Sequence, residues 1–469
     1  MISFTNTQSR KKEEFKPLED KQVTIYTCGP TVYNFVTIGN FRAFMSYELL
    51  KRWLKFRGFN VKHVMNITDV DDKTISGSRE NNTSLQEFTG KYIKEFWEDY
   101  KTLRIEPADI APKATEHIPQ MIKLIEILVE KGHAYAAEDG SVYFAINSLK
   151  DYGKLSHLEK REIKTGARIV SDEYEKDNAS DFVLWKAWTE NDGDVKWESP
   201  WGPGRPGWHL ECSVMAQTYL GDTIDIHMGG EDLIFPHHEN EIAQSEAATG
   251  KPFVKYWVHN GFLLVEGKKM SKSLGNYYTL RDIIDKGWTG REIRYLLLSV
   301  HYRQQFNFTF DGLHSARSAL QRLDALREQL GKLIAEKKEG GLSEKVLEAV
   351  EKTRTVWTES LDDDLNISPA LGGMFELVRQ ANRWIDEGKL NSSEAEAVLE
   401  FLDETDKVLD IKGGDSEIPQ KVLDLVDERL IVRKEKNWAR ADEIRDELAE
   451  LGYVVEDTPE GPRVKASNQ

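Results

Sequence analysis

Apolar residues in the first 70 positions follow two different periods. The run KQVTIYTC at 21–28 is mostly apolar and predicts a buried strand, and NVKHVMNI at 60–67 predicts a second one. Between them, large apolar residues recur every three or four positions, on one face of a helix: Phe41, Met45, Leu49, Trp53 and Phe56. Gly58 follows where a left-handed C-cap belongs. A strand, a helix and a strand within about fifty residues form a βαβ unit, so we expect a doubly wound α/β domain.

The pattern changes twice further along the chain. The pair Asp139-Gly140 between alternating apolar runs predicts a β-hairpin, and polar, acidic sequence follows from Ser171 to Asn191. We therefore interpret 119–200 as an insertion, after which the α/β pattern resumes at 223–228 and 255–265. From about 312 a helical stripe begins, and similar patterns continue to about 411. A glycine-containing linker at 413–419 and a small module, with one helix and a short hairpin, complete the chain.

Size and charge narrow the class of protein. A chain of 469 residues is too long for one ordinary core, so we expect two to four domains. Its first twenty residues contain no apolar signal region, and no apolar run approaches the ~20 residues of a membrane span. We therefore expect a cytoplasmic protein without a membrane partner. The net charge of −17 argues against a general nucleic-acid coat but not against local recognition of a nucleic acid.

Only two cysteines are present, and both lie in chemically dense segments. Cys28 ends the first strand, and Cys212 lies in a helix that we expect to begin at Pro206 and end at Gly221. Trp208 and Cys212 are four residues apart, so their side chains share a helical face. Without a secretory signal the compartment is expected to be reducing, which disfavours a disulfide and leaves a metal site or two buried thiols.

The segment FPHHENE could supply further metal ligands. Pro236 suits a helix start, and His237 and Glu241 are four apart, so they point the same way; His238, three from Glu241, is the rival ligand. Two cysteines, a histidine and a carboxylate are a set that Zn²⁺ accepts. The alternative is a pair of structural thiols with two histidines that cap a helix.

Three other segments could bind phosphates or a nucleoside. The glycine turn VTIGN leads into a helix N-terminus, where free N–H groups favour an anion. VEGKKMSKSLGN carries Lys269 and Lys272 in a loop that could close over phosphates. HMGGEDLIF follows a strand, so its glycines allow close approach of a ligand and Asp232 could hold a ribose hydroxyl. Each of these segments is weak evidence for a binding site when taken alone, because such turns and hairpin tips are common in proteins without a ligand there.

Together the segments resemble the cysteinyl-tRNA synthetases of class I. TCGPTVYNFVTIGN is similar to that family's cysteine-bearing segment ending in the HIGH motif, and KMSKS at 269–273 matches the second class signature. GRPGWHLECS and FPHHENEIAQS are similar to its zinc-ligand segments, and ADEIRDELAELGYVVEDTPEG to its anticodon-binding end. The resemblance spans about residues 22–463.

The resemblance implies a site and a reaction. It implies one Zn²⁺ per chain, held by Cys28, Cys212, His237 and Glu241. Cysteine would then bind the metal through its sulfur, in a pocket formed by Gly29, Thr68 and Trp208. ATP, with Mg²⁺, would lie on Gly39, Asn40, Gly229, Gly230 and Asp232, and Lys272 with Lys269 would stabilise the departing pyrophosphate. Cysteine would be activated to an adenylate and transferred to the 3′ end of tRNA(Cys), without an editing domain.

One residue departs from the family pattern. Thr37 occupies the position where the HIGH motif usually begins with histidine, whereas Asn40 is an accepted variant of its last position. Threonine can donate a hydrogen bond but carries no charge, so we expect slower activation. Two alternatives stay open: a ligase that joins cysteine to an amino sugar in low-molecular-weight thiol synthesis, and a non-catalytic paralogue that binds cysteine or tRNA.

The resemblance also implies a domain plan. We expect a Rossmann-like catalytic domain at 1–118 and 201–265, interrupted by a connective insertion at 119–200. A junction domain with the KMSKS loop would occupy 266–311, a helical bundle 312–412 and an anticodon-binding module 413–469. The family also leads us to expect a monomer.

Overall fold

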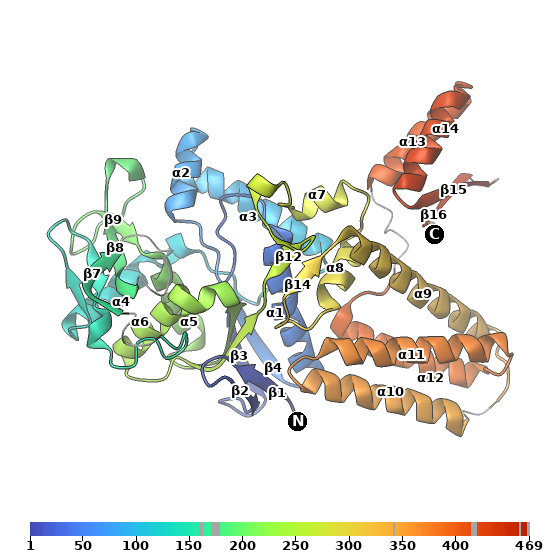
Figure 1. Ribbon diagram of the computed structural model, residues 1–469, viewed down its shortest axis with the longest axis horizontal. Helices are drawn as coiled ribbons and strands as arrows, with labels where there is room; N and C mark the ends of the chain where they lie inside the picture. The colour runs from blue at the N-terminus through green and yellow to red at the C-terminus, as the bar shows by residue number, and fades with distance from the viewer. Residues whose placement is uncertain (159–162, 170–178, 341–342, 414–419, 459–460, 467–469) are drawn as a thin grey trace.

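The computed structural model describes residues 1–158, 163–169, 179–340, 343–413, 420–458 and 461–466. Figure 1 shows an α/β region at the centre, an inserted β-sheet on one side of it, and a group of long helices on the other. A small module of two helices and a hairpin lies at the C-terminal end. Within these ranges, none of the helices combines the length and the apolar composition that a membrane span requires.

The central sheet contains four parallel strands in the order β11-β10-β3-β4. They are β3 (Gln22–Thr27), β4 (Asn60–Met65), β10 (Ile224–Gly230) and β11 (Val254–Asn260). The chain passes from β3 through α1 (Ile38–Phe56) to β4, while β10 pairs with the opposite edge of β3. The carboxyl ends of β3 and β10 therefore flank a switch point, which is where open α/β sheets bind ligands.

The βαβ unit predicted from the sequence is confirmed. Gly58 has φ +87°, so it provides the left-handed turn that ends α1. A hairpin β1 (Ser3–Asn6) and β2 (Lys11–Glu14) precedes the unit. Three helices follow β4: α2 (Asp72–Glu80), α3 (Leu85–Thr102) and α4 (Ile118–Glu130).

A five-stranded sheet is inserted between α4 and the second half of the central sheet. Its strands are β5 (Ala134–Ala136), β6 (Val142–Phe144), β7 (Ile163–Ile169), β8 (Ala179–Ala187) and β9 (Gly204–Pro206). The hairpin predicted at Asp139-Gly140 is confirmed, since β5 and β6 are antiparallel and Gly140 has φ +88°. Part of the acidic stretch, 171–178, lies outside the described residues.

The helix expected to begin at Pro206 begins at Trp208 instead. Gly204–Pro206 pairs with β8 as a short strand, with Pro206 as its last residue. Helix α5 (Trp208–Leu220) follows, and α6 (Glu239–Thr249) lies between β10 and β11. Short 3₁₀ turns among the described residues of this half are Ala114–His117, Ile146–Ser148, Glu190–Asp192, Glu231–Leu233 and Lys272–Leu274.

The apolar run 255–265 is divided between two sheets. β11 ends at Asn260, and β12 (Leu263–Val265) joins β13 (Lys268–Lys269) and β14 (Phe306–Phe308) in a separate sheet. Gly261 lies at the crossing, where a Cβ would meet the carbonyl oxygen of Arg303 at 2.8 Å. Helices α7 (Leu280–Ile284) and α8 (Gly290–Leu298) follow the lysine loop.

Four long helices form the bundle that follows. They are α9 (Phe310–Ala335), α10 (Glu344–Asp362), α11 (Ile367–Asp386) and α12 (Ser392–Leu409). The predicted α9 stripe is buried from Leu313 to Leu330. Arg294 of α8 is fully buried, pairs with Glu48 of α1 at 2.7 Å and donates to the carbonyl of Leu409 at 2.6 Å. These bonds fix the end of the bundle against the catalytic half.

The C-terminal module has a small core of its own. It contains α13 (Gln420–Lys434), α14 (Trp438–Glu450) and the hairpin β15 (Tyr453–Thr458) and β16 (Gly461–Ala466). The helix and the hairpin predicted here are confirmed, whereas α13 was not predicted. The linker expected at 413–419 lies, apart from Gly413, outside the described residues.

Candidate active site

A cavity of about 650 Å³ lies at the carboxyl ends of the central strands. Cys28 lines it just after β3, Asn66 after β4, Gly230 at the end of β10, and Asn260 at the end of β11. Residues from the lysine loop reach the same space. The cavity therefore gathers side chains from segments that are more than two hundred residues apart in the sequence.

The four predicted metal ligands meet at one side of this cavity. Their ligand atoms, from Cys28, Cys212, His237 and Glu241, all lie within 4.8 Å of one another, and all four side chains are buried. Cys212 comes from α5 and Glu241 from α6. His237 lies just before α6, after a kink at Phe235, whose backbone is extended (φ −136°, ψ 132°). Cys28, Cys212 and His237 line the cavity, and Glu241 lies behind them.

His238 remains a rival in the structure. Cys28, His227, His238 and Glu241 form a second group that meets the same distance limit. In this group His238 Nε2 lies 3.3 Å from Cys28 Sγ while its Nδ1 bonds to His259 Nε2 at 2.7 Å. His227 Nε2 bonds to Glu241 Oε2 at 2.9 Å. Neither histidine lines the cavity. The first set is thus the one that a substrate in the cavity could reach.

Two buried side-chain atoms of the predicted metal ligands have no hydrogen bond among the described residues, which suits a bound cation. His237 Nε2 lies 3.1 Å from Glu241 Oε1, yet both atoms are buried without a hydrogen bond among the described residues. Burial raises the pKa of Glu241 to about 8 and lowers that of His237 to about 3, and it raises the pKa of both cysteine thiols. A divalent cation would offset the desolvation of the carboxylate and thiolates, and neutral imidazole is the form that binds metals. The residues therefore fit a zinc ion.

Aromatic and polar side chains pack around the predicted metal ligands and the adjoining cavity wall. Trp208 stacks on His237 with ring centroids 4.1 Å apart and planes 25° apart, and both residues line the cavity. The N–H of Gly29 donates to Asn66 Oδ1 at 2.8 Å, and Asn66 donates to Thr68 Oγ1 at 3.0 Å. Gly29 and Asn66 line the cavity, whereas Thr68 is buried behind Asn66.

Thr37 is the N-cap of α1. Its hydroxyl donates to Asn40 Oδ1 at 2.7 Å and accepts from the Asn40 N–H at 3.4 Å, so the two residues form a capping box. Both residues and Gly39 line the cavity. The departure from histidine at Thr37 therefore places a helix-capping hydroxyl at the anion-attracting end of α1.

The two predicted lysines are placed differently. Lys269 lines the cavity, but Lys272 does not; its ammonium lies 5.3 Å from the ring centroid of Tyr277, which does. The loop touches the α1 turn, since a Cβ on Gly39 would meet Met270 Cε at 3.2 Å. Closure of the loop would be needed to bring Lys272 to a ligand in the cavity.

The residues after β10 have separate structural roles. A Cβ on Gly229 would lie 2.5 Å from His238 Cε1, so this glycine makes room for the His238 ring and does not line the cavity. Gly230 and Asp232 do line it. Sequence reasoning missed Tyr33, Asn66 and Lys73 of the cavity wall. They lie in the segments TCGPTVYN and NITDVDDK, so their proximity to motif residues was the available signal.

Three family models match the chain. A model of the class I (C) tRNA synthetase catalytic domain matches residues 14–318, a DALR domain matches 356–411, and a cysteinyl-tRNA ligase anticodon-binding domain matches 415–463. The first of these covers more than half of the chain.

Curated relatives match over nearly the whole length. A cysteine–tRNA ligase of Chlamydia felis is 50% identical over 463 residues, which are 98% of this chain and 97% of the relative. One from Brachyspira hyodysenteriae is 49% identical over 473 residues, with 99% of each covered.

Solved structures share the fold at low identity. Mycobacterium tuberculosis methionyl-tRNA synthetase with methionyl-adenylate is similar with a TM-score of 0.62 and 14% identity, over 82% of this chain and 89% of that one. A putative arginyl-tRNA synthetase of Campylobacter jejuni gives 0.58 and 12%, over 86% and 96%. With the family models and the 50% identical relatives, these findings establish that the chain belongs to the cysteine–tRNA ligase family of class I aminoacyl-tRNA synthetases.

Proposed function

We propose that this chain activates L-cysteine with ATP and transfers it to the 3′ end of tRNA(Cys), with one zinc ion selecting the substrate by its sulfur. The observation that carries the proposal is the set of four buried ligand atoms, within 4.8 Å of one another, beside a cavity that the α1 turn also lines. Cysteine at the metal end of this cavity would have its carboxylate directed toward ATP at the other end.

Cys28, Cys212, His237 and Glu241 would hold the zinc. When bound there, zinc supplies a strong preference for a thiolate over a neutral hydroxyl. Such a preference is needed because an apolar pocket discriminates poorly between cysteine and serine, and a factor of ~10⁴ requires about 5.5 kcal/mol. Trp208, stacked on His237, would keep that imidazole oriented and close the side-chain pocket against water.

The remaining site residues would handle ATP. The positive dipole end of α1, at Gly39 and Asn40, would favour the phosphates, and Gly230 and Asp232 line the cavity where they would hold the adenosine. Lys269 already faces the cavity, and Lys272 would join it when the loop closes, so that both neutralise charge on the departing pyrophosphate, with Mg²⁺. No protein nucleophile is required, because positioning and charge neutralisation suffice.

The acceptor is proposed to be tRNA and not an amino sugar. The match of 415–463 to an anticodon-binding domain supports this choice, because a ligase acting on an amino sugar has no use for such a module. We further propose that the protein acts in the cytoplasm as a monomer.

The proposal is tested by measuring the cysteine-dependent exchange of pyrophosphate into ATP. The metal content of the same sample is analysed in parallel. We expect exchange with cysteine, far slower exchange with serine, and one zinc per chain. Metal-free protein with full exchange, or equal exchange with serine, would contradict it. Zinc-loaded protein that gives no exchange would favour the non-catalytic alternative.

A further inference from the structure

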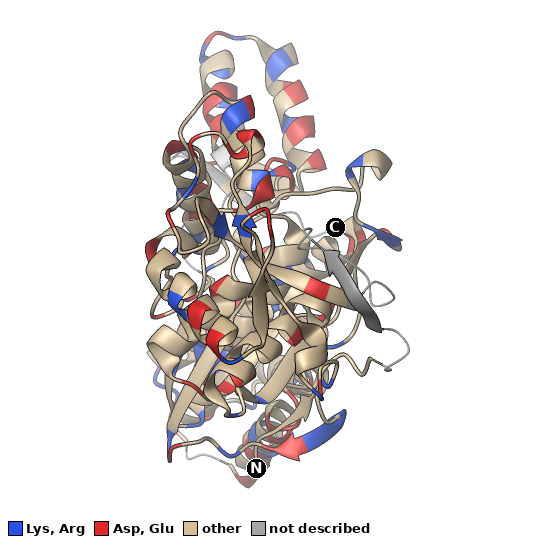
Figure 2. Cartoon of the chain, turned by 90° about the vertical axis from the view of Figure 1, so that its left-hand side faces the viewer, with Lys and Arg blue, Asp and Glu red and all other residues tan. Residues whose placement is uncertain are grey.

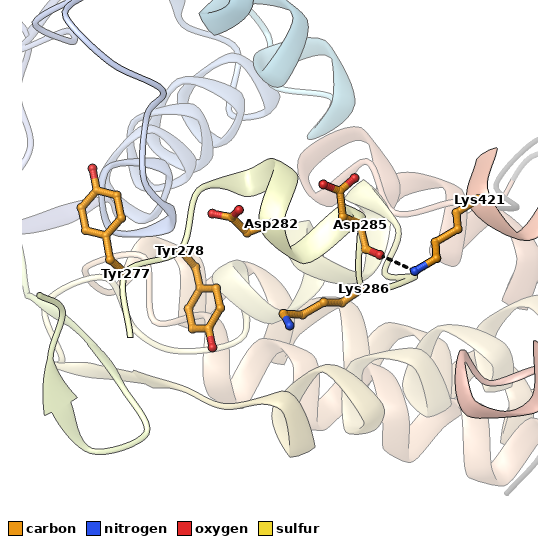
Figure 3. Close-up of a pocket in the computed structure, with 6 residues that line it drawn as sticks. All are labelled: Tyr277, Tyr278, Asp282, Asp285, Lys286 and Lys421. Atoms are coloured by element: carbon orange, nitrogen blue, oxygen red, sulfur yellow. Dashed lines mark hydrogen bonds between the residues drawn. The ribbon is translucent and has the colours of Figure 1, made fainter. Parts of the chain in front are cut away.

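A second hollow, of about 470 Å³, lies at the seam between the catalytic half and the C-terminal module (Figure 3). We call it the seam; its residues are Tyr277, Tyr278, Asp282, Asp285, Lys286 and Lys421. The first five belong to α7 and the segments on either side of it, just after the lysine loop. Lys421 belongs to α13 of the module, and its ammonium donates to the carbonyl oxygen of Asp285 at 3.1 Å.

The geometry of the seam is fixed by one buried arginine. Arg317 of α9 donates to the carbonyl of Gly287 and to that of Leu451, each at 3.0 Å. Its guanidinium also lies between two rings, 4.3 Å from the centroid of Trp288 and 5.1 Å from that of Tyr453. Because Leu451 and Tyr453 belong to the module and the other two follow α7, Arg317 holds Lys421 beside the α7 turn.

The two lysines of the seam have no acidic partner. Among the described residues, neither Lys286 nor Lys421 forms an ion pair, although the chain has a net charge of −17. Asp282 is committed to its own helix, since its carboxylate accepts from the N–H and the hydroxyl of Thr279, both at 2.7 Å. Figure 3 shows Lys421 directed at the backbone oxygen of Asp285, with the carboxylate of that residue on the other side. Both ammonium groups are exposed and keep N–H donors for an external anion, which would approach from the side away from the two carboxylates of the hollow.

The seam adjoins the catalytic cavity, because Tyr277 lines both hollows. Figure 2 shows Lys and Arg interspersed with Asp and Glu along the elements in view. A polyanion that reached both the catalytic cavity and the module would have to be recognised by a few local cations.

We propose that Lys286 and Lys421 bind the ribose-phosphate backbone of the tRNA between its anticodon and its acceptor end. This inference rests on the proposed function, because it is tRNA whose two ends would occupy the module and the catalytic cavity. Phosphate contacts of this kind position a nucleic acid without reading its sequence. Tyr278 adds a ring face and a hydroxyl group on the side of Lys286 (Figure 3).

The test uses the full-length variants Lys286→Gln, Lys421→Gln and both together. Lys251→Gln is the matched control: it removes the same charge from an exposed lysine that pairs with Asp222, just before the amino ends of β11 and β10. We expect each seam variant to raise the KM for tRNA charging about fivefold, and to lower the slope of log Kd for tRNA against log salt by about 0.7–0.9. Pyrophosphate exchange without tRNA, kcat for charging and the control should change less than about twofold.

The outcomes separate this inference from the proposed function. Unchanged KM and salt slope in the double variant would overturn the inference, while exchange with cysteine would still support the proposed function. An effect of Lys421→Gln without one of Lys286→Gln would also overturn it, because only Lys421 bonds across the seam and its loss could act through docking of the module. Equal losses in exchange and charging would mean that the lysines serve folding, which contradicts a role in tRNA binding.

Discussion

Replacing Cys212 with serine removes one soft ligand from the proposed zinc site and little else. The residue is fully buried on α5, and the hydroxyl is close in size to the thiol, so packing is nearly preserved. Apparent free energies of zinc binding in structural sites are about 10–16 kcal/mol, so one of four ligands is worth roughly 3 kcal/mol. That loss corresponds to a zinc Kd raised by about 100-fold or more.

The assay combines metal competition with cysteine-dependent pyrophosphate exchange. Cys212→Ser is expected to lose zinc and to raise the KM for cysteine together, while far-ultraviolet circular dichroism stays unchanged. Met215→Leu is the control, because Met215 is fully buried on the same helix but does not line the cavity. If Cys212→Ser kept both its zinc and its cysteine affinity, Cys212 would not be a ligand, and the second group with His227 and His238 would take its place.

Three further changes test other parts of the site. Lys272→Ala is expected to slow pyrophosphate exchange about 100-fold through lost charge stabilisation, with zinc content unchanged; loss of zinc would indicate misfolding instead. Thr37→Ala is expected to cost about 1 kcal/mol in chemical denaturation by removing the N-cap of α1, and to slow exchange, whereas Thr37→Ser should restore both; equal behaviour of the two would refute a role for the hydroxyl. Gly229→Ala is expected to lower the free energy of unfolding by about 1–3 kcal/mol, because its Cβ would displace the His238 ring, whereas Gly230→Ala meets only the side chain of Asp232; equal stability losses would show that the His238 contact is unimportant.

Local periodicity was sufficient for most of the secondary structure. The strand, helix and strand of the opening unit, the hairpin at Asp139-Gly140 and the stripe of α9 were predicted because each depends on neighbours in sequence. The errors fall where a distant segment decides the outcome. Gly204–Pro206 forms a strand because β8 is there to pair with it, and the run 255–265 breaks at Gly261 because the backbone of Arg303 crosses it.

The composition and spacing of the motifs determined which residues could bind zinc and phosphate, since ligand chemistry is a property of the side chain. Only the tertiary structure decided their arrangement: it gathered Cys28 and Cys212 with His237 at the cavity wall, left His238 enclosed, and directed Lys272 onto Tyr277. It also joined Lys286 and Lys421, 135 residues apart, in one hollow. Distances between remote segments depend on how whole elements pack, and no local pattern in a single sequence encodes them.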